Sequence, residues 1–343
     1  MNEIEIIYIG LFLFLSGVTS FFLNKYIYNV FSNNKILDPI TSRSSHRSKA
    51  TRSGGLSIFL TISVCFAIAS STAGLVIEPY ALLGIIFMAI TGIADDFFNV
   101  RYREKFFLQI FAGIIILQAG FKIDSFHGIF GIYEISDWIA KIITLFVFII
   151  IVNALNLIDG LDGLAVLILI NFFLCIAGVV ILNSKEMMFF FPISIGALLG
   201  FLVHNFNSAK KVFLGDTGSL FMGSIIAFFT FYMLDSSNEL IIDSYISRPL
   251  FCVLVLIYPL SDTLRVILVR SYKRQSPFVA DRIHLHHRLV DKGYQHWEAS
   301  LLVFVLSILV LIVNLFLFQF IGLSLCVLLT LLVLIIFYYI FFK

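Results

Sequence analysis

Charged residues are scarce in this chain, and their scarcity excludes a water-soluble protein. They make up 13% of the 343 residues, whereas 60% of the residues are hydrophobic and 39 are phenylalanine. A typical soluble domain carries roughly 25% charged residues. With so little charge to cover so much apolar side chain, the protein is expected to lie in a lipid bilayer.

Cysteine is also rare, and the four cysteines are not spaced to bind a metal. Cys65, Cys175, Cys252 and Cys326 all lie in apolar runs, and no two of them have Cys-x-x-Cys spacing. We interpret them as small buried hydrophobic residues rather than as a disulfide or as thiolate ligands. The sequence also lacks a low-complexity linker and a convincing internal repeat. We therefore expect one membrane-embedded domain that comprises residues 1–343.

Long apolar runs are what the sequence has instead. A helix needs about 20 apolar residues to cross the hydrocarbon core, and the sequence offers about eleven such segments. It therefore predicts an all-α, polytopic integral membrane protein with about 11 transmembrane helices. The expected spans are residues 5–24, 56–77, 79–94, 106–121, 138–156, 164–183, 188–206, 218–235, 249–270, 299–318 and 321–341.

The basic residues predict how these spans are oriented. Lys and Arg favour short cytoplasmic loops. If successive spans cross the membrane in alternating directions, the Lys and Arg residues fall on one side of the membrane or at the edge of that side. The exceptions are Lys122, Lys141, Lys185 and Arg248. The N-terminus is therefore expected outside and the C-terminus in the cytoplasm. The resulting cytoplasmic loops comprise residues 25–55, 95–105, 157–163, 207–217 and 271–298.

Aspartates stand at or just beyond the cytoplasmic ends of several apolar runs. They are Asp95, Asp96, Asp159, Asp162 and Asp216. A carboxylate near hydrocarbon costs about 2.5–3.5 kcal/mol on insertion scales, so it needs a partner, a cation or a function. The simpler alternatives are an ordinary acidic helix end, Asp-Gly turns, and a plain N-cap for Asp216. Because all five fall on one predicted face, we expect them to form a single polar site.

Three polar side chains follow one another at regular spacing near the end of one apolar run. Asn156, Asp159 and Asp162 would share one face if the segment were helical. Gly160 and Gly163 instead favour a turned segment that brings these side chains together. The residue order does not match an EF-hand calcium loop, whereas Mg²⁺ needs only one or two carboxylates beside substrate phosphates. A hard-cation or nucleotide site is therefore expected here.

The first predicted cytoplasmic loop is rich in basic residues, among them Lys49 and Arg52, and ends on Gly54-Gly55. Glycine permits close backbone approach, and a helix N-terminus presents free N–H groups to an anion. We favour phosphate binding by this loop. Contact with anionic lipid headgroups is the alternative.

The longest predicted cytoplasmic loop contains a cluster of histidines. His284, His286 and His287 lie within four residues, flanked by Arg282 and Arg288. The sequence offers no His-Glu-x-x-His pattern or cysteine set, which disfavours zinc. The flanking arginines favour an anion such as a diphosphate. A purely structural role for the histidines is the remaining alternative.

Taken in order, these motifs resemble those of the polyprenyl-phosphate N-acetylhexosamine-1-phosphate transferases, and the resemblance covers nearly the whole chain. The motifs are Asp95-Asp96, Asn153-x-x-Asn156-x-x-Asp159-Gly-x-Asp162-Gly-x-Ala, Phe213-x-Gly-Asp216-x-Gly-Ser and Asp281-Arg-x-His284-Leu-His-His287-Arg-Leu. The last motif is similar to the bacterial N-acetylglucosamine-1-phosphate branch. The muramoyl-pentapeptide branch carries three consecutive histidines followed by Phe-Glu instead. The first loop also resembles transferases that use 6-deoxy-N-acetylhexosamines, although Lys49-Ala50-Thr51 stands where relatives usually have Pro-Thr-Pro.

The resemblance implies transfer of N-acetylhexosamine-1-phosphate, with N-acetylglucosamine as the expected sugar, from a UDP-sugar to undecaprenyl phosphate with release of UMP. Mg²⁺ is the implied cofactor, with Mn²⁺ as an alternative. Membrane lipids and a second copy of the chain are further expected partners, and nucleic acid is not. The implied location is the bacterial inner membrane, with the active site facing the cytoplasm. Alternatives are a 6-deoxy-N-acetylhexosamine or MurNAc-pentapeptide donor, and a membrane transporter.

By the same resemblance, the acidic motifs receive chemical roles. Asp216 is the expected Mg²⁺ ligand, with Asn156 as a second contributor. Asp95 is expected to orient or deprotonate the lipid phosphate. The expected catalytic residues are Asp95, Asp96 and Asp159.

The other motifs are implied to bind the substrates. Lys49 and Arg52 are expected to approach the phosphate of the lipid. The residues expected to bind the nucleotide or the sugar are Asp162, Arg282, His284, His286 and His287.

Overall fold

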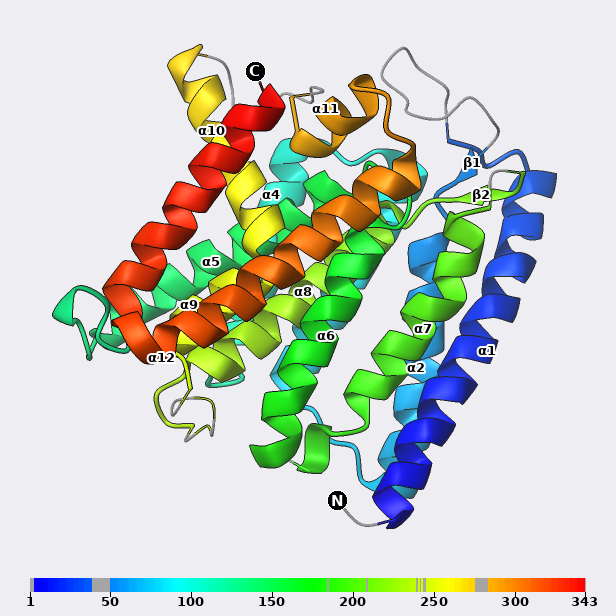
Figure 1. Ribbon diagram of the computed structural model, residues 1–343. Helices are drawn as coiled ribbons and strands as arrows, with labels where there is room; N and C mark the ends of the chain where they lie inside the picture. The colour runs from blue at the N-terminus through cyan, green and yellow to red at the C-terminus, as the bar shows by residue number, and fades with distance from the viewer. Residues whose placement is uncertain are drawn as a thin grey trace.

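The computed structural model describes residues 3–38, 50–183, 185–207, 209–238, 240, 242, 245–274 and 283–342. Within these ranges the chain is a bundle of helices joined by loops (Figure 1). The helices are α1 (Glu3–Asn33), α2 (Gly54–Ala73), α3 (Pro79–Phe98), α4 (Tyr102–Leu117), α5 (Asp137–Ile158), α6 (Leu164–Asn183), α7 (Phe190–Asn205), α8 (Gly215–Leu234), α9 (Arg248–Val255), α10 (Ile257–Tyr272), α11 (Leu285–Asp291) and α12 (His296–Phe342). The short elements are strands β1 (Ala50–Thr51) and β2 (Lys211–Val212) and the 3-10 turns η1 (Ile129–Gly131) and η2 (Lys185–Met187).

Among the described residues, seven helices are long and apolar enough to cross a membrane, or eight if the bent pair α9–α10 counts as one span. These helices confirm an all-α membrane protein. The pair α9–α10 differs from the expected single span 249–270, because the chain bends by 80° at Leu256. The expected spans 106–121 and 188–206 fall on α4 and α7, which have 16 residues each. The last two expected spans together form α12, whose 47 residues are interrupted at Gly322.

Helix α8 forms the centre of the bundle and packs against α2, α3 and α5. Every residue of α8 except Asp216 is buried. Glycines permit the close crossings: a Cβ on Gly92 of α3 would lie 2.4 Å from Thr217 Cα, and a Cβ on Gly55 of α2 would lie 2.0 Å from Gly218 N. Small residues let helix backbones approach in this way. The first turn of α8 is therefore fixed directly beside α2 and α3.

A short parallel strand pair, which the sequence did not lead us to expect, joins two distant loops. Ala50 of β1 pairs with Lys211 of β2. The pairing continues into α2, because Gly54 N donates to Phe213 O over 3.0 Å. A Cβ on Gly54 would lie 2.6 Å from that same carbonyl oxygen, so close backbone packing explains this glycine. The loop before α8 is thereby held against the start of α2.

The elements that carry the predicted site gather at one end of the molecule. Figure 1 shows β1, β2, α11 and the C-terminus at this end and the N-terminus at the other. Termini at opposite ends are what an odd number of membrane crossings would produce.

Candidate functional site

A lysine joins the end of α3 to the start of α8. Lys105, in the first turn of α4, donates to Asp95 Oδ2 over 2.7 Å and forms a second ion pair with Asp216 Oδ1. Burial by itself lowers the pKa of an ammonium group, but the Asp216 and Asp95 carboxylates outweigh it and raise the pKa of Lys105 above its usual value. A positive charge therefore lies between the two carboxylates at neutral pH.

Asp96 is turned toward the N-terminus of α8. Its Oδ1 accepts from Asp216 N at 3.0 Å, and its Oδ2 accepts from Thr217 N at 2.9 Å and from Thr217 Oγ1 at 2.7 Å. A carboxylate at this position satisfies N–H groups that have no partner within the helix and complements the helix dipole. Helix α8 begins at Gly215, and Asp96 accepts from the free amides of its first turn. Asp216 is therefore not a plain N-cap, which was the simpler alternative.

The turn after α5 supplies the third side of the site. Asn156 Nδ2 donates to Asp216 Oδ1 over 2.6 Å, and Asp159 Oδ2 accepts from Gly215 N at 3.0 Å. Burial is the main cause of a pKa of Asp159 well above its usual value, and the charges of Asp216 and Asp96 raise this pKa further. The polar groups of α5 therefore converge on the first turn of α8.

Five residues that we expected from the sequence thus lie in one network, which we call the acidic site; they are Asp95, Asp96, Asn156, Asp159 and Asp216. Carboxylate and amide oxygens are the ligands that Mg²⁺ prefers. The Lys105 ammonium also marks a point between Asp95 and Asp216 where the protein stabilises positive charge. Several carboxylates surround this point, so the site fits a magnesium ion at Asp216 that takes the place of the Lys105 ammonium, with the Asn156 amide turned to present its oxygen.

Of the two basic residues expected to meet the lipid phosphate, Arg52 lies beside the acidic site, whereas Lys49 is outside the described residues. Arg52 Cβ is 3.2 Å from where a Cβ on Gly215 would stand. Its Nε donates to Asp38 Oδ1 over 2.7 Å. Burial lowers the pKa of Arg52, but the charges of Asp38 and the acidic site raise it more. Arg52 is thus a fixed cation at the first turn of α8.

Asp162 lies in an ion-pair cluster at the turn between α5 and α6. Lys211 of β2 contacts its Oδ2, and His296 Nδ1 at the start of α12 lies 3.3 Å from the same oxygen. Burial raises the pKa of Asp162, but the His296 and Lys211 contacts outweigh it and hold the pKa below its usual value. Asp162 therefore ties three elements together, and its contact with uridine stays a prediction.

Two histidines lie directly against the turn that carries Asp159. A Cβ on Gly160 would lie 2.9 Å from His286 Nε2 and 3.5 Å from His287 Cε1. Glycine at this position therefore lets the imidazole rings approach the backbone. Burial, followed by the charge of His287, lowers the pKa of His286 well below its usual value, so this ring is neutral at pH about 7.

The third histidine completes the cluster. The rings of His284 and His286 are stacked, with centroids 5.4 Å apart. His286 Nδ1 lies 2.9 Å from the Tyr258 hydroxyl. Arg282 lies outside the described residues. The histidine cluster of α11 thus borders the acidic site through Gly160.

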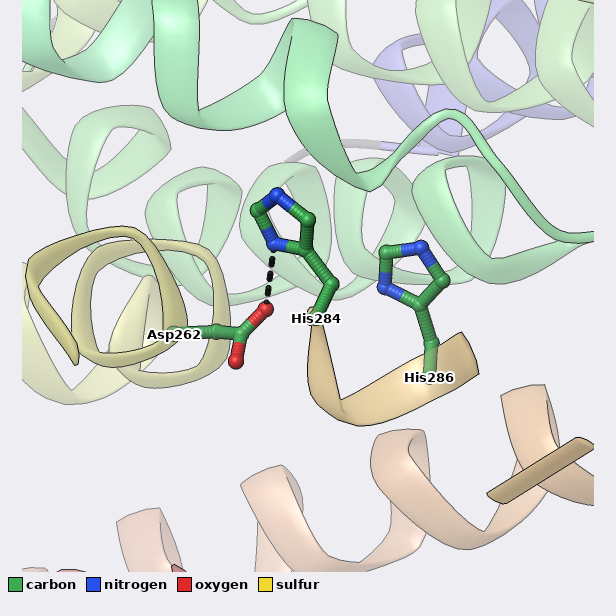
Figure 2. A group of neighbouring side chains, drawn as sticks. All are labelled: Asp262, His284 and His286. Carbon is green, nitrogen blue, oxygen red and sulfur yellow. Dashed lines mark hydrogen bonds and ion pairs between the residues drawn. The ribbon is translucent and has the colours of Figure 1, made fainter. Parts of the chain in front are cut away.

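Asp262, His284 and His286 form a group whose possible metal-ligating atoms lie within 4.8 Å of one another (Figure 2). His284 Nδ1 donates to Asp262 Oδ2 over 2.8 Å, and Arg265 Nη2 donates to Asp262 Oδ1 over 2.9 Å. A metal ion here would meet the Arg265 guanidinium and would have to replace the hydrogen bond from His284. This group therefore fits a cation poorly.

Two residues of this region were not predicted from the sequence. Lys105 stands among other basic residues whose presence the charge rule for cytoplasmic loops already explains, so no signal separates it from Arg101 and Arg103. Asp262 did carry a signal, because it is a carboxylate inside an expected apolar span.

Comparisons with known proteins agree with this arrangement. Residues 79–234, which contain the whole acidic site, match the model of the family described as glycosyl transferase family 4. A Bacillus subtilis protein named probable undecaprenyl-phosphate N-acetylglucosaminyl 1-phosphate transferase is 31% identical over 273 residues, which cover 79% of this chain and 74% of the relative. The decaprenyl-phosphate N-acetylglucosaminephosphotransferase of Mycolicibacterium smegmatis is 30% identical over 76% of this chain and 70% of its own length. The phospho-N-acetylmuramoyl-pentapeptide-transferase of Staphylococcus carnosus is 29% identical over 77% and 84%.

The similarity to these relatives extends well beyond the acidic site on both sides. It includes most of this chain and more than two thirds of each relative named above. The chain therefore belongs to glycosyl transferase family 4, the family of the polyprenyl-phosphate N-acetylhexosamine-1-phosphate transferases.

Proposed function

We propose that the protein transfers N-acetylglucosamine-1-phosphate from UDP-N-acetylglucosamine to undecaprenyl phosphate and releases UMP. The observation that carries the proposal is the Lys105 ammonium held between Asp95 and Asp216 at the meeting point of α3, α4 and α8. Such a site stabilises positive charge among carboxylates, as a reaction between two phosphate esters requires. The names of the Bacillus and Mycolicibacterium relatives support the donor and acceptor.

The reaction is a displacement at phosphorus. An oxygen of the lipid phosphate attacks the β-phosphorus of the UDP-sugar, and the bond from that phosphorus to the oxygen bridging to the α-phosphate breaks. The sugar keeps its bond to the β-phosphate, and UMP leaves with the bridging oxygen. Catalysis of such a step depends mainly on in-line positioning and on charge stabilisation.

The residues of the acidic site have separate tasks in this proposal. Asp95 orients the attacking phosphate and accepts its proton if it is protonated, while Lys105 holds the Asp95 and Asp216 carboxylates in place. Asp216, with Asn156, would hold Mg²⁺, which when bound neutralises charge on the phosphates. Asp96 and Asp159 fix the first turn of α8 through its amide groups.

The neighbouring groups are proposed to bind the substrates. Arg52, at the first turn of α8, would meet the phosphate of the lipid, and the histidine cluster beside Gly160 would meet the diphosphate or the sugar. Charge-assisted hydrogen bonds of this kind are among the strongest available for phosphate recognition. The two substrates would thereby meet at the acidic site.

We further propose eleven membrane crossings in the bacterial inner membrane, with the acidic site facing the cytoplasm. α4 and α7 would be short spans, and α12 would cross twice, with its break at Gly322, where φ is 72°. Single cysteines in place of the exposed Glu104 and Glu134 test this orientation. An impermeant maleimide added to intact cells should label position 134 and not position 104, and the reverse pattern would overturn it.

The metal role of Asp216 is tested by comparing Asp216→Asn with the wild type across a Mg²⁺ titration in detergent, with Asp124→Asn on the opposite side as control. Loss of an electrostatic catalytic group costs roughly 10²–10³ in kcat. Asp216→Asn should lose at least that much and need more Mg²⁺, while the control matches the wild type. Unchanged turnover with unchanged Mg²⁺ dependence would refute the assignment.

The same assay run with a panel of donors tests the sugar. UDP-N-acetylglucosamine should be the best substrate, and mass spectrometry of the lipid product identifies what was transferred. Preference for a UDP-MurNAc-pentapeptide or a UDP-6-deoxy-N-acetylhexosamine would replace the proposed donor and leave the reaction type intact.

A further inference from the structure

A carboxylate inside the bent helix pair has no role in the acidic site and is nevertheless fully buried. The side chain of Asp262 in α10 has 0% of its surface exposed. Its oxygens accept from His284 Nδ1 at 2.8 Å, from Leu285 N at 3.2 Å, and from Arg265 Nη2 at 2.9 Å. A buried carboxylate is costly unless such donors satisfy it. Every one of these partners belongs to the same helix or to the start of α11.

Arg265 of α10 compensates the charge of Asp262, and the last turns of α12 hold Arg265 in place. The Arg265 guanidinium lies 4.0 Å from the centroid of the Phe342 ring and 5.4 Å from that of Tyr338. Arg265 also donates to the carbonyl oxygen of Ile283, directly before His284. Stacking on aromatic rings restricts a guanidinium to one plane. The C-terminal end of α12 therefore fixes Arg265 and, through it, Asp262.

Asp262 determines which nitrogen of His284 carries a proton. A carboxylate only accepts hydrogen bonds, so Nδ1 of His284 must be the donor in the 2.8 Å contact. Figure 2 shows Asp262 reaching from α10 to this nitrogen, while the other ring nitrogen points away from the carboxylate. The partner of one imidazole nitrogen sets the chemistry of the other. Nε2 of His284 is therefore left available for a ligand.

The neighbouring ring is aimed at the α5–α6 turn. His286 is anchored at Nδ1 by Tyr258, and its buried Nε2 has no hydrogen-bond partner among the described residues. That Nε2 is the atom closest to where a Cβ on Gly160 would stand, next to Asp159. Since a buried polar atom without a partner is costly, this one points to a ligand. The stacked rings of His284 and His286 are thus buried together beside the acidic site.

We propose that Asp262 is a positioning residue for the donor sugar: it fixes the ring orientation and the Nδ1–H form of His284, so that Nε2 accepts a hydrogen bond from a hydroxyl or amide N–H group of the UDP-sugar. The inference rests on the proposed function and deepens it. Asp262 touches no substrate itself. Its effect reaches the donor through His284, and Arg265 with the C-terminal aromatic residues keeps it in place.

Kinetics of Asp262→Asn, His284→Gln and the double variant test whether the two residues act as a unit. Loss of a hydrogen bond between neutral groups should raise KM for UDP-N-acetylglucosamine roughly three- to tenfold. KM for undecaprenyl phosphate and the Mg²⁺ requirement should change by less than about threefold, because only donor binding is affected. The double variant should be no worse than His284→Gln alone. Thr263→Val, buried one residue along α10, is the packing control and should match the wild type.

Additive effects of the two substitutions, or equal losses for both substrates, would show that Asp262 acts only on the fold. Nitrogen-15 NMR of histidine-labelled protein in bilayers gives a readout that needs no turnover. The His284 signal, identified by its loss in His284→Gln, should report a protonated Nδ1 when the ring is neutral, and an Nε2–H form in the wild type would overturn the proposal. Wild-type protein that transfers no sugar phosphate from any UDP-sugar would instead contradict the proposed function, and the NMR result would still decide whether Asp262 fixes the Nδ1–H form of His284.

Discussion

Charge compensation is the main feature of the site at the scale of single residues. Asp95 and Asp216 come from helices far apart in the sequence, and Lys105 contacts both. Without a cation, two carboxylates in this partly buried position would repel one another and one of them would take up a proton. The lysine therefore offsets the repulsion between the two carboxylates.

Replacing Lys105 by Met should lower kcat by roughly 10²-fold, because the acids lose the charge that holds them in place. Turnover at saturating substrate and Mg²⁺ measures this loss. Arg103→Met is the matched control, since Arg103 lies on the same helix and its side chain contacts only the exposed Tyr102 among the contacts described. Lys105→Met turnover within about threefold of the wild type would contradict the assigned role, because no such interaction would then have been removed.

Asp162 yields a prediction about stability and pH. Its pKa is lowered in the folded protein by Lys211 and His296, so the ion pair stabilises the fold above the pKa of the unfolded chain, about 3.9, and is lost as pH falls through that region. Asp162→Asn leaves the Lys211 charge buried and should cost about 3 kcal/mol at neutral pH.

Thermal unfolding followed by the fluorescence of Trp138 and Trp297 measures this difference. Wild type and Asp162→Asn should converge only as pH falls below about 3.9, toward the lowered pKa of Asp162 in the folded protein. The exposed Glu104→Gln is the control and should unfold like the wild type at every pH. A gap between Asp162→Asn and the wild type that stays constant with pH would mean that the ion pair does not contribute.

Close helix crossings position the acids at the scale of elements. Gly92 of α3 leaves room for the first turn of α8, and a Cβ at this position would lie 2.5 Å from Asp216 O. Gly92→Ala should therefore force the helices apart and lower stability by about 1–3 kcal/mol, as overpacking does. Misplacement of reacting groups by about 1 Å can cost 10²-fold in rate, so activity should fall as well.

Gly178→Ala in α6 provides the control for this prediction, because a Cβ on Gly178 would meet no atom within 4 Å. Alanine is a better helix former than glycine by about 1 kcal/mol, so this variant should be as stable as the wild type or more so. Melting temperature and turnover of the two variants, measured side by side, show whether the close crossing at Gly92 is needed. If Gly92→Ala behaves like Gly178→Ala, the crossing of α3 and α8 does not position Asp216.

The sequence predicted the elements of the site better than it predicted the contacts between them. Gly54, Gly160 and Gly215 are local signals, and the structure places each at a helix start or in a turn where another residue packs closely against it. The β1–β2 pair left no local signal, because it depends on segments that meet only in the folded chain. Lys105 was missed for the same reason, since its two partners lie on α3 and α8. The break at Leu256 did leave a signal that was not used, because Pro259 in the first turn of α10 cannot donate to the carbonyl of Val255.

At the scale of the whole molecule, the acidic site, the histidine cluster and the β1–β2 pair lie together at one end of a lipid-embedded bundle. This placement suits an enzyme with one substrate anchored in the bilayer and another in the cytoplasm. A transporter, by contrast, usually holds its polar groups near the bilayer midplane, on broken helices. The bent pair α9–α10 is a broken helix of that kind, and its buried Asp262 already accepts hydrogen bonds from Arg265 and His284.

The most direct test of the central claim follows the β-phosphate of the donor. Purified protein is incubated with undecaprenyl phosphate, Mg²⁺ and UDP-N-acetylglucosamine that carries phosphorus-32 only in the β-phosphate. We predict that the label moves to the lipid together with the sugar, that unlabelled UMP appears in equal amount, and that Asp216→Asn forms neither product. Label that stays on the nucleotide as UDP while the sugar reaches the lipid, or no transfer at all by the wild type, would contradict sugar-phosphate transfer by this site.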